Sequence, residues 1–202
     1  MTKQIKFAAG TCLLPLLFLL LATRCPAQET PSWEFYGGYA LEKAEVRGYY
    51  KSSSIVYSVT NQRVTLHGWK ASVTENANRW LGGTAEVSGH YNTLNYKGTA
   101  TRGNIYSVLY GPRFSARFHG VVPFLHVLLG VAHLQSKATP TGPHDSKFSF
   151  AATAAGGLDL RLGKTVALRA FQVEYYRTSY FTTDRDRLRA SAGILFYLGK
   201  RK

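Results

Sequence analysis

The chain contains few cysteines and few acidic residues, and it has no long apolar run after its first segment. Its two cysteines are Cys12 and Cys25, both near the N-terminus. If that segment is removed on export, disulfide bonds, thiol catalysis and cysteine-bound metal are excluded together. An exported chain without disulfides must take its stability from a folded core or from a membrane.

Residues 1–27 have the layout of a secretory signal. Lys3 and Lys6 precede the apolar run LLPLLFLLL, and the sequence CPA ends at Ala27. We therefore expect a cleaved signal peptide at 1–27 and a single domain at 28–202. A transmembrane helix is the weaker alternative, because Pro15 interrupts the run and the run is shorter than the roughly twenty apolar residues that a spanning helix needs. Lipid attachment at Cys25 is weaker still.

The charge balance is strongly basic, with 25 Lys and Arg against 11 Asp and Glu. Loss of the signal peptide, which carries Lys3, Lys6 and Arg24, would lower the formal charge from +14 to +11. Clustered basic residues interleaved with aromatics are missing, so a nucleic-acid partner is not expected. Acidic lipid headgroups or surface polysaccharide are the more natural counter-charge.

Alternation of apolar with small or polar residues is the dominant pattern after residue 30, and a 3.6-residue period is missing. It is clearest in two runs, 104–115 and 121–134, separated by the short segment 116–120, which predicts a hairpin. Both runs are longer than an ordinary globular strand and match the roughly nine to eleven residues that a tilted strand needs to cross a bilayer.

The same pattern predicts eight strands in the whole chain. They cover residues 33–41, 62–74, 80–91, 104–115, 121–134, 148–162, 166–176 and 187–198. The segments between them alternate long and short, starting with a long polar loop at 42–61. In an antiparallel up-and-down sheet, this order places every long loop at one rim, as in bacterial outer-membrane barrels. We expect an all-β, eight-stranded antiparallel up-and-down transmembrane β-barrel.

Residue volume indicates which face of the strands lies outside. The polar faces hold mainly Gly, Ala, Ser and Thr, which fit the narrow interior of an eight-stranded barrel. Bulky apolar residues are therefore expected against lipid: Phe150, Leu160, Leu125, Leu129, Ile194 and Phe196. Aromatic residues near the strand ends are expected in interfacial girdles: Trp33, Trp80, Tyr91, Tyr106, Tyr175 and Phe148.

This assignment sends charged side chains into the lumen. They are Lys70, Glu86, Arg113, Asp159, Arg161, Glu174 and Arg189. Lys70 and Glu86 should lie diagonally opposite across the hairpin that folds at 75–79. Unpaired buried charges cost several kcal/mol each, so we expect a paired, structural network. An ion path or gate is the sharper alternative.

The chain resembles the small eight-stranded outer-membrane barrels of the OmpA transmembrane type. The resemblance rests on RWLGGTAEVSGHY, YGPRFS, PFLHVLLGVAH and the closing RASAGILFYLG. These are patterns and not catalytic signatures, so the resemblance implies fold and location more than activity. It implies residence in a bacterial outer membrane, among its lipids and lipopolysaccharide, after insertion by the outer-membrane assembly machinery.

Hidden chemistry has little support in the residue spacing. A Ser, a His and an acid could meet near the outer rim, from the set His90, His133, Ser88, Ser136, Asp184 and Asp186. None of these lies in a recognisable motif. His126 is expected to be a packed lumen residue, and metal binding has no support in ligand spacing. We expect neither an enzyme nor a cofactor.

The sequence thus predicts a monomeric outer-membrane barrel with a side-chain-filled lumen and a structural or surface-interaction role, or a role as a minor pore. The principal alternative is a soluble exported barrel that binds an apolar ligand, as lipocalins do. A lipid-modifying outer-membrane enzyme is a further alternative.

Overall fold

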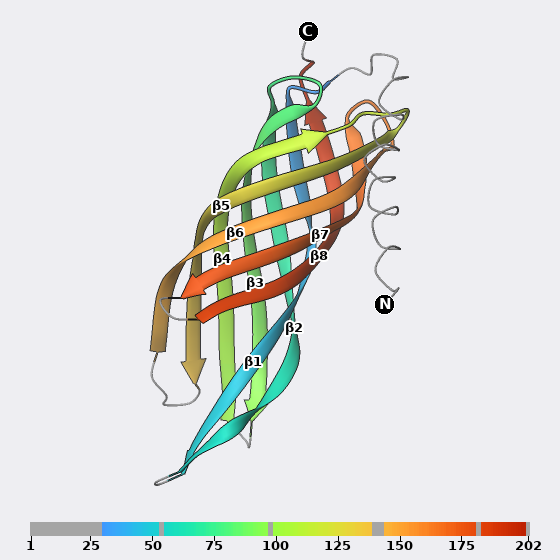
Figure 1. Ribbon diagram of the computed structural model, residues 1–202. Helices are drawn as coiled ribbons and strands as arrows, with labels where there is room; N and C mark the ends of the chain where they lie inside the picture. Colours follow the sequence, from blue (N-terminus) through green and yellow to red (C-terminus); the bar gives the residue numbers. More distant parts are fainter. Residues whose placement is uncertain (1–29, 53–54, 97–98, 139–143, 181–182, 201–202) are drawn as a thin grey trace, which may run out of the picture.

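The chain forms a closed barrel of eight antiparallel strands in sequence order (Figure 1). This computed structural model describes residues 30–52, 55–96, 99–138, 144–180 and 183–200. The strands are β1 (Trp33–Ser52), β2 (Ile55–Asn76), β3 (Leu81–Tyr96), β4 (Thr99–Ser115), β5 (Val121–Ala138), β6 (His144–Arg161), β7 (Val166–Tyr180) and β8 (Thr183–Leu198). The fold predicted from the sequence is confirmed.

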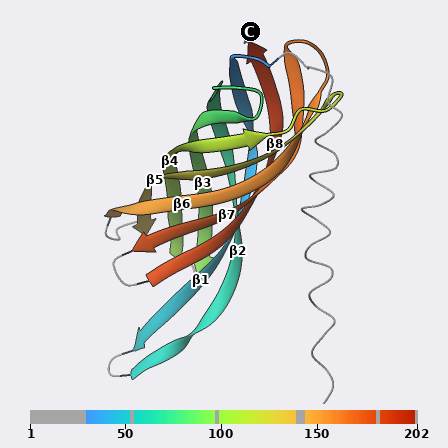
Figure 2. The ribbon, with the colours of Figure 1, turned by 45° about the horizontal axis from the view of Figure 1, so that its top comes forward.

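The sheet closes between its first and last strands. β1 pairs with β8 from Trp33 opposite Leu198 to Lys43 opposite Leu188. Figures 1 and 2 show that the strands are strongly tilted, as closure of a barrel requires. Within the described residues, no helix is long and apolar enough to span a membrane. The predicted signal peptide at 1–27 lies outside the described residues.

The strands extend further than the sequence pattern predicted at one rim. The predicted long loop at 42–61 is wrong, because β1 and β2 remain paired up to Ser52 opposite Ile55. The other predicted long loops are likewise largely strand, which leaves only 97–98, 139–143 and 181–182 between the strands there. The apolar–polar alternation ends near Leu41, but the hydrogen-bonded ladder does not depend on it and continues.

The first hairpin therefore extends beyond the other strands at this rim. β1 has partners in β8 only up to Lys43, and β2 has partners in β3 only from His67 onward. Beyond these points β1 and β2 pair with each other alone, as a two-stranded ribbon that projects past the other strands (Figure 1). The sequence predicted long loops at this rim. The structure instead has longer strands there, and β1 and β2 extend furthest.

The opposite rim has tight turns at 77–80, 116–120 and 162–165. In the second of these, the Phe118 amide donates to the Val121 carbonyl at 2.9 Å, and Gly120 has a φ of 79°. Few residues other than glycine adopt this φ readily, which explains a glycine at the end of this turn. The hairpin predicted from residues 104–134 is thus confirmed.

The wall of the barrel is apolar outside and mainly polar inside. Large apolar side chains on all eight strands are exposed, among them Leu125, Val127, Leu129 and Val131, which alternate along β5. The residues between them, such as His126 and Leu128, are buried. The predicted outward direction of Phe150, Leu125, Leu129, Ile194 and Phe196 is confirmed, and Leu160 is half-buried.

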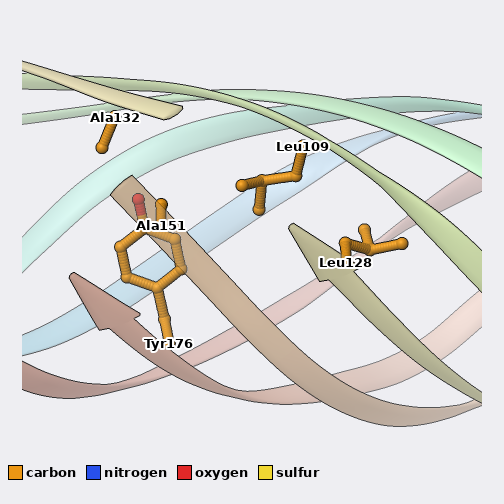
Figure 3. Packing of buried hydrophobic residues seen from close by; sticks show 5 residues of the cluster. All are labelled: Leu109, Leu128, Ala132, Ala151 and Tyr176. Carbon is orange, nitrogen blue, oxygen red and sulfur yellow. The ribbon is translucent and has the colours of Figure 1, made fainter. Parts of the chain in front are cut away.

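Among the side chains that the structure describes, apolar packing inside the barrel occurs in small groups. The largest joins Leu109, Leu128, Ala132, Ala151 and Tyr176, which come from β4, β5, β6 and β7 (Figure 3). A second group lies around Leu195 and Tyr36. The narrow lumen leaves the remaining inner volume to polar and charged side chains.

A β-bulge interrupts the alternation of β7. The pairing register with β8 shifts between Arg169 and Gln172, so that Ala170 and Phe171 are both exposed. Arg169 and Gln172 are both buried as a result. Strict alternation counted from Glu174 would have placed Arg169 outside.

Candidate functional site

The lumen holds a dense set of buried charges. Among the described residues the buried acids are Glu34, Glu42, Glu86, Asp159 and Glu174, and the buried bases are Lys70, Arg113, Arg117, Arg169, Arg187 and Arg189. Each is no more than 8% exposed. Strand alternation directs most of them into the lumen; the β7 bulge turns Arg169 inward, and Arg117 lies in a turn. The contacts between these residues fall into three layers along the barrel.

The first layer lies near the tight turns and is built on Asp159 of β6. Arg113 Nη2 lies 2.7 Å from Asp159 Oδ2, and Arg169 Nε lies 2.7 Å from Asp159 Oδ1. The two guanidinium carbons lie 4.1 and 4.2 Å from the centre of the Phe124 ring. Asp159 therefore holds two arginines from different strands, both packed against one aromatic ring.

Glu34 of β1 extends the first layer toward the rim. Its carboxylate lies 3.1 Å from Arg113 Nη1 and 2.9 Å from Arg117 Nη2, and it accepts a hydrogen bond of 2.9 Å from Asn76 Nδ2. Arg117 also donates to the Arg79 carbonyl. Burial lowers the pKa of the Arg117 guanidinium, and the Glu34 carboxylate acts in the opposite direction. Arg117 thus covers the tight-turn end of the lumen.

The middle layer is centred on Lys70 of β2. Lys70 Nζ lies 3.1 Å from Glu86 Oε1 and also contacts Glu174 Oε1. Gln172 donates to Glu174 and accepts a hydrogen bond of 2.6 Å from Arg169 Nη1. The middle layer is therefore linked to the first through one amide side chain.

The third layer is centred on Glu42 of β1. Glu42 lies 2.6 Å from Arg187 Nη1 and 2.7 Å from Arg189 Nε, both on β8. The Arg189 guanidinium carbon lies 3.4 Å from the centre of the Tyr176 ring. Since Glu42 and Arg189 are register partners where β1 meets β8, this pair lies on the seam that closes the barrel.

The structure places six of the seven predicted lumen charges inside the barrel: Lys70, Glu86, Arg113, Asp159, Glu174 and Arg189. Arg161, the seventh, is half-buried at the tight-turn rim, with its guanidinium carbon 4.9 Å from the centre of the Tyr197 ring. The last residue of β6 therefore faces the rim and lies outside the three layers.

The prediction missed several members of the network for identifiable reasons. Arg169 was not predicted because the bulge reverses the direction of its side chain. Glu42 was not predicted because it was assigned to a loop. Arg117 lies in a turn, where alternation has no meaning. Glu34 and Arg187 share the inward faces of their strands, so the alternation itself could have identified them.

Among the residues considered for catalysis, the two described histidines and Ser88 do not come together. Ser88 and His90 point into the lumen, where Ser88 Oγ lies 2.7 Å from Ser107 Oγ. His133 lies on the outer face, stacked on Phe148 with a centroid distance of 4.3 Å. The wall of the barrel thus separates the two histidines. The side chains of Ser136, Asp184 and Asp186 lie outside the described set.

A group of potential metal ligands does occur in the middle layer. Glu86, His126 and Glu174 each present one ligand atom, and these atoms lie within 4.8 Å of one another. All three residues are buried.

Aromatic contacts surround the outer face near both ends of the strands. Trp80 stacks on Phe114 near the tight turns, with ring centroids 6.0 Å apart and planes inclined by 14°. Toward the other rim, Trp69 Nε1 donates to the Tyr91 hydroxyl at 3.0 Å, and Tyr91 meets Tyr106 edge to face. Of the predicted girdle residues, Tyr106 is half-buried and the others are exposed on the outer face: Trp33, Trp80, Tyr91, Tyr175 and Phe148.

Comparison with known proteins shows similarity in structure alone. No protein-family model matches the chain, and no curated protein matches its sequence. Neisserial surface protein A superposes with a TM-score of 0.63 at 15% identity, over 85% of this chain and 100% of the other.

Two further solved structures are similar. Ail, the attachment invasion locus protein of Yersinia pestis, in complex with the heparin analogue sucrose octasulfate, has a TM-score of 0.54 at 17% identity, over 81% of this chain and 97% of the other. The outer membrane protein OprG of Pseudomonas aeruginosa has a TM-score of 0.52 at 8% identity, over 87% and 100%. The chain has the fold of the small eight-stranded outer-membrane β-barrels.

Proposed function

We propose that this protein is a monomeric integral barrel of a bacterial outer membrane, with a structural or surface-interaction role and no enzymatic activity. The main observation is that apolar side chains are exposed on the outer face and charged side chains are buried inside, the reverse of a water-soluble protein. Leu125, Leu129 and Phe150 are more than half exposed, whereas Arg113, Asp159 and Arg189 are at most 2% exposed. In water this arrangement would expose apolar side chains on every strand, but in a bilayer each face meets a suitable medium.

The soluble alternative fits these observations poorly. A lipocalin-like barrel needs an apolar cavity inside, and the described lumen is crossed by three layers of ion pairs. A single apolar ligand would have to displace buried charges that already hold one another. The exposed aromatic residues near both ends of the strands also suit the two lipid–water interfaces of a bilayer.

We propose that the charged lumen is a structural plug. Asp159 and Glu42 each hold two arginines, and Lys70 is held by two carboxylates. Charges held in this way are fixed by their partners and lie across the path that a passing ion would take. A minor pore would require the layers to rearrange, so we expect the protein to conduct little or not at all.

The projecting ribbon of β1 and β2 supports a role in contact at the cell surface. It stands at the rim opposite the tight turns, which in outer-membrane barrels face the periplasm. The similar barrel Ail was solved with a heparin analogue, a polyanion. The basic chain described here would meet lipopolysaccharide or surface polysaccharide as its natural counter-charge.

Export would proceed through cleavage of the signal peptide at 1–27, followed by insertion through the outer-membrane assembly machinery. Cell fractionation tests the proposal. We expect the protein in the outer-membrane fraction, extractable only with detergent, and with a gel mobility that changes on boiling. Recovery in the soluble periplasm would contradict it.

A further inference from the structure

The middle layer of the lumen contains buried polar atoms that form no hydrogen bond. Glu86 Oε2, Glu174 Oε2 and His126 Nε2 are buried without a hydrogen-bond partner. The residues belong to β3, β7 and β5, so three separate strands direct them to one place. A buried polar atom without a partner is unfavourable, and three such atoms at one place are suited to a shared ligand.

The side chains converge tightly enough to share one ion. A ligand atom of Glu86, one of His126 and one of Glu174 all lie within 4.8 Å of one another. Around a tetrahedral ion with bonds of about 2.0–2.2 Å, the ligand atoms are about 3.4 Å apart. Small rotations of two glutamates and one imidazole would close the remaining gap.

A positive charge already occupies part of this site. Lys70 Nζ lies 3.1 Å from Glu86 Oε1 and contacts Glu174 Oε1, and Lys70 is 1% exposed. The two carboxylates are therefore arranged around a cation in the structure. A second cation at the same place would be repelled by the ammonium, so Lys70 would compete with it.

We propose that Glu86, His126 and Glu174 form a lumenal binding site for a divalent transition-metal ion of the zinc type, with Lys70 as its internal competitor. The donor set identifies the class of ion. Imidazole nitrogen combined with carboxylate oxygen suits zinc and its neighbours, whereas magnesium and calcium prefer oxygen donors alone. The ion would link β3, β5 and β7 across the lumen, as Lys70 now links β2, β3 and β7.

The exchange of the ammonium for a metal gives a direct test. In Lys70→Met the two glutamates lose their counter-charge, so the variant should fold poorly in the presence of a chelator. If the site binds zinc, Zn²⁺ should restore the charge balance. The purified protein is unfolded in urea and refolded into detergent with chelator, Zn²⁺ or Mg²⁺, and the folded fraction is read from heat-modifiable gel mobility.

We expect Zn²⁺ to raise the folded fraction of Lys70→Met at least severalfold over chelator, and Mg²⁺ to leave it unchanged. After desalting, the refolded variant should retain about one zinc ion per chain, and the original protein should bind zinc at least about tenfold more weakly. Adding His126→Gln should abolish both effects.

The matched control is Lys70→Met combined with His133→Gln. His133 lies on the outer face, stacked on Phe148, and takes no part in the lumen. This variant should respond to Zn²⁺ as fully as Lys70→Met alone. The proposal is overturned if Zn²⁺ fails to raise the folded fraction of Lys70→Met, or if the rescue and the bound zinc persist after His126→Gln.

Discussion

The two faces of the same strands follow opposite rules. Along β5, Leu125, Val127 and Leu129 are exposed, and His126 between them is buried beside charged groups. The outer face has low specificity, because many apolar residues satisfy a lipid environment equally well. The inner face is specific, because each buried charge depends on named partners. A substitution on the inner face should therefore lower the free energy of unfolding when it removes a charged partner. A substitution on the outer face should lower it only when it introduces a polar or charged side chain.

The largest effect is expected from Asp159→Asn on the inner face. Arg113 and Arg169 would both lose the carboxylate that lies 2.7 Å from each guanidinium group, and Arg113 would keep Glu34 as a partner. Loss of one partner of a buried ion pair costs about 3–5 kcal/mol. Urea unfolding in lipid vesicles, followed by gel mobility, measures the difference. A loss below about 1 kcal/mol would show that Asp159 does not hold the network.

The outer face should respond next, through Leu129→Arg. Leu129 lies on the outer face of β5 and is 52% exposed. An arginine near the middle of a bilayer costs about 2–4 kcal/mol on the lipid face of a barrel. The same unfolding measurement applies, with Leu129→Val as the control for shape. An arginine tolerated as well as valine would mean that this face meets water.

A smaller effect is expected from Glu86→Gln in the middle layer. Lys70 would keep Glu174 as a partner, so the loss should be about 1–3 kcal/mol. Conductance across planar bilayers should stay unchanged, because the layers on either side still fill the lumen. An unchanged unfolding free energy would remove the structural assignment of this pair, and new conductance would favour a gate.

The smallest effect is expected from Trp80→Leu at the tight-turn rim. The variant keeps an apolar side chain but loses the stack on Phe114. Aromatic pairs contribute about 0.5–1.5 kcal/mol beyond the burial of area. The unfolding measurement in vesicles reads this loss, and Val127→Leu serves as an outer-face control without an aromatic partner. A larger loss than that of Asp159→Asn would reverse the ranking of the two faces.

The outer face of the barrel could be predicted from the sequence, and so could much of the lumen. Alternation in β5 and β6 identified both faces, because successive side chains of a strand point to opposite faces of the barrel wall. It also directed Glu86, Asp159 and Arg189 inward. Diagonal proximity of Lys70 and Glu86 followed from a short hairpin alone.

The remaining features depend on a β-bulge, on strand length and on contacts across the lumen, none of which the apolar–polar alternation predicts. The bulge in β7 adds one residue and turns Arg169 inward, where it meets Asp159. Glu42 could have been found only by extending β1 beyond its apolar pattern, which would have set it opposite Arg189 at the seam. Contacts across the lumen, such as Arg113 with Asp159, join strands that are not neighbours, so no register predicts them.

The direction of alternate side chains can be measured directly, because residues 28–202 contain no cysteine. Single cysteines placed in turn at positions 125–132 and labelled with a fluorophore report lipid contact through a quencher carried on the lipid tails. We expect strong quenching at 125, 127, 129 and 131, and weak quenching or failure to label at the positions between them. Equal quenching along the strand, or full labelling by a water-soluble reagent at the odd positions, would contradict a barrel whose apolar face meets the membrane.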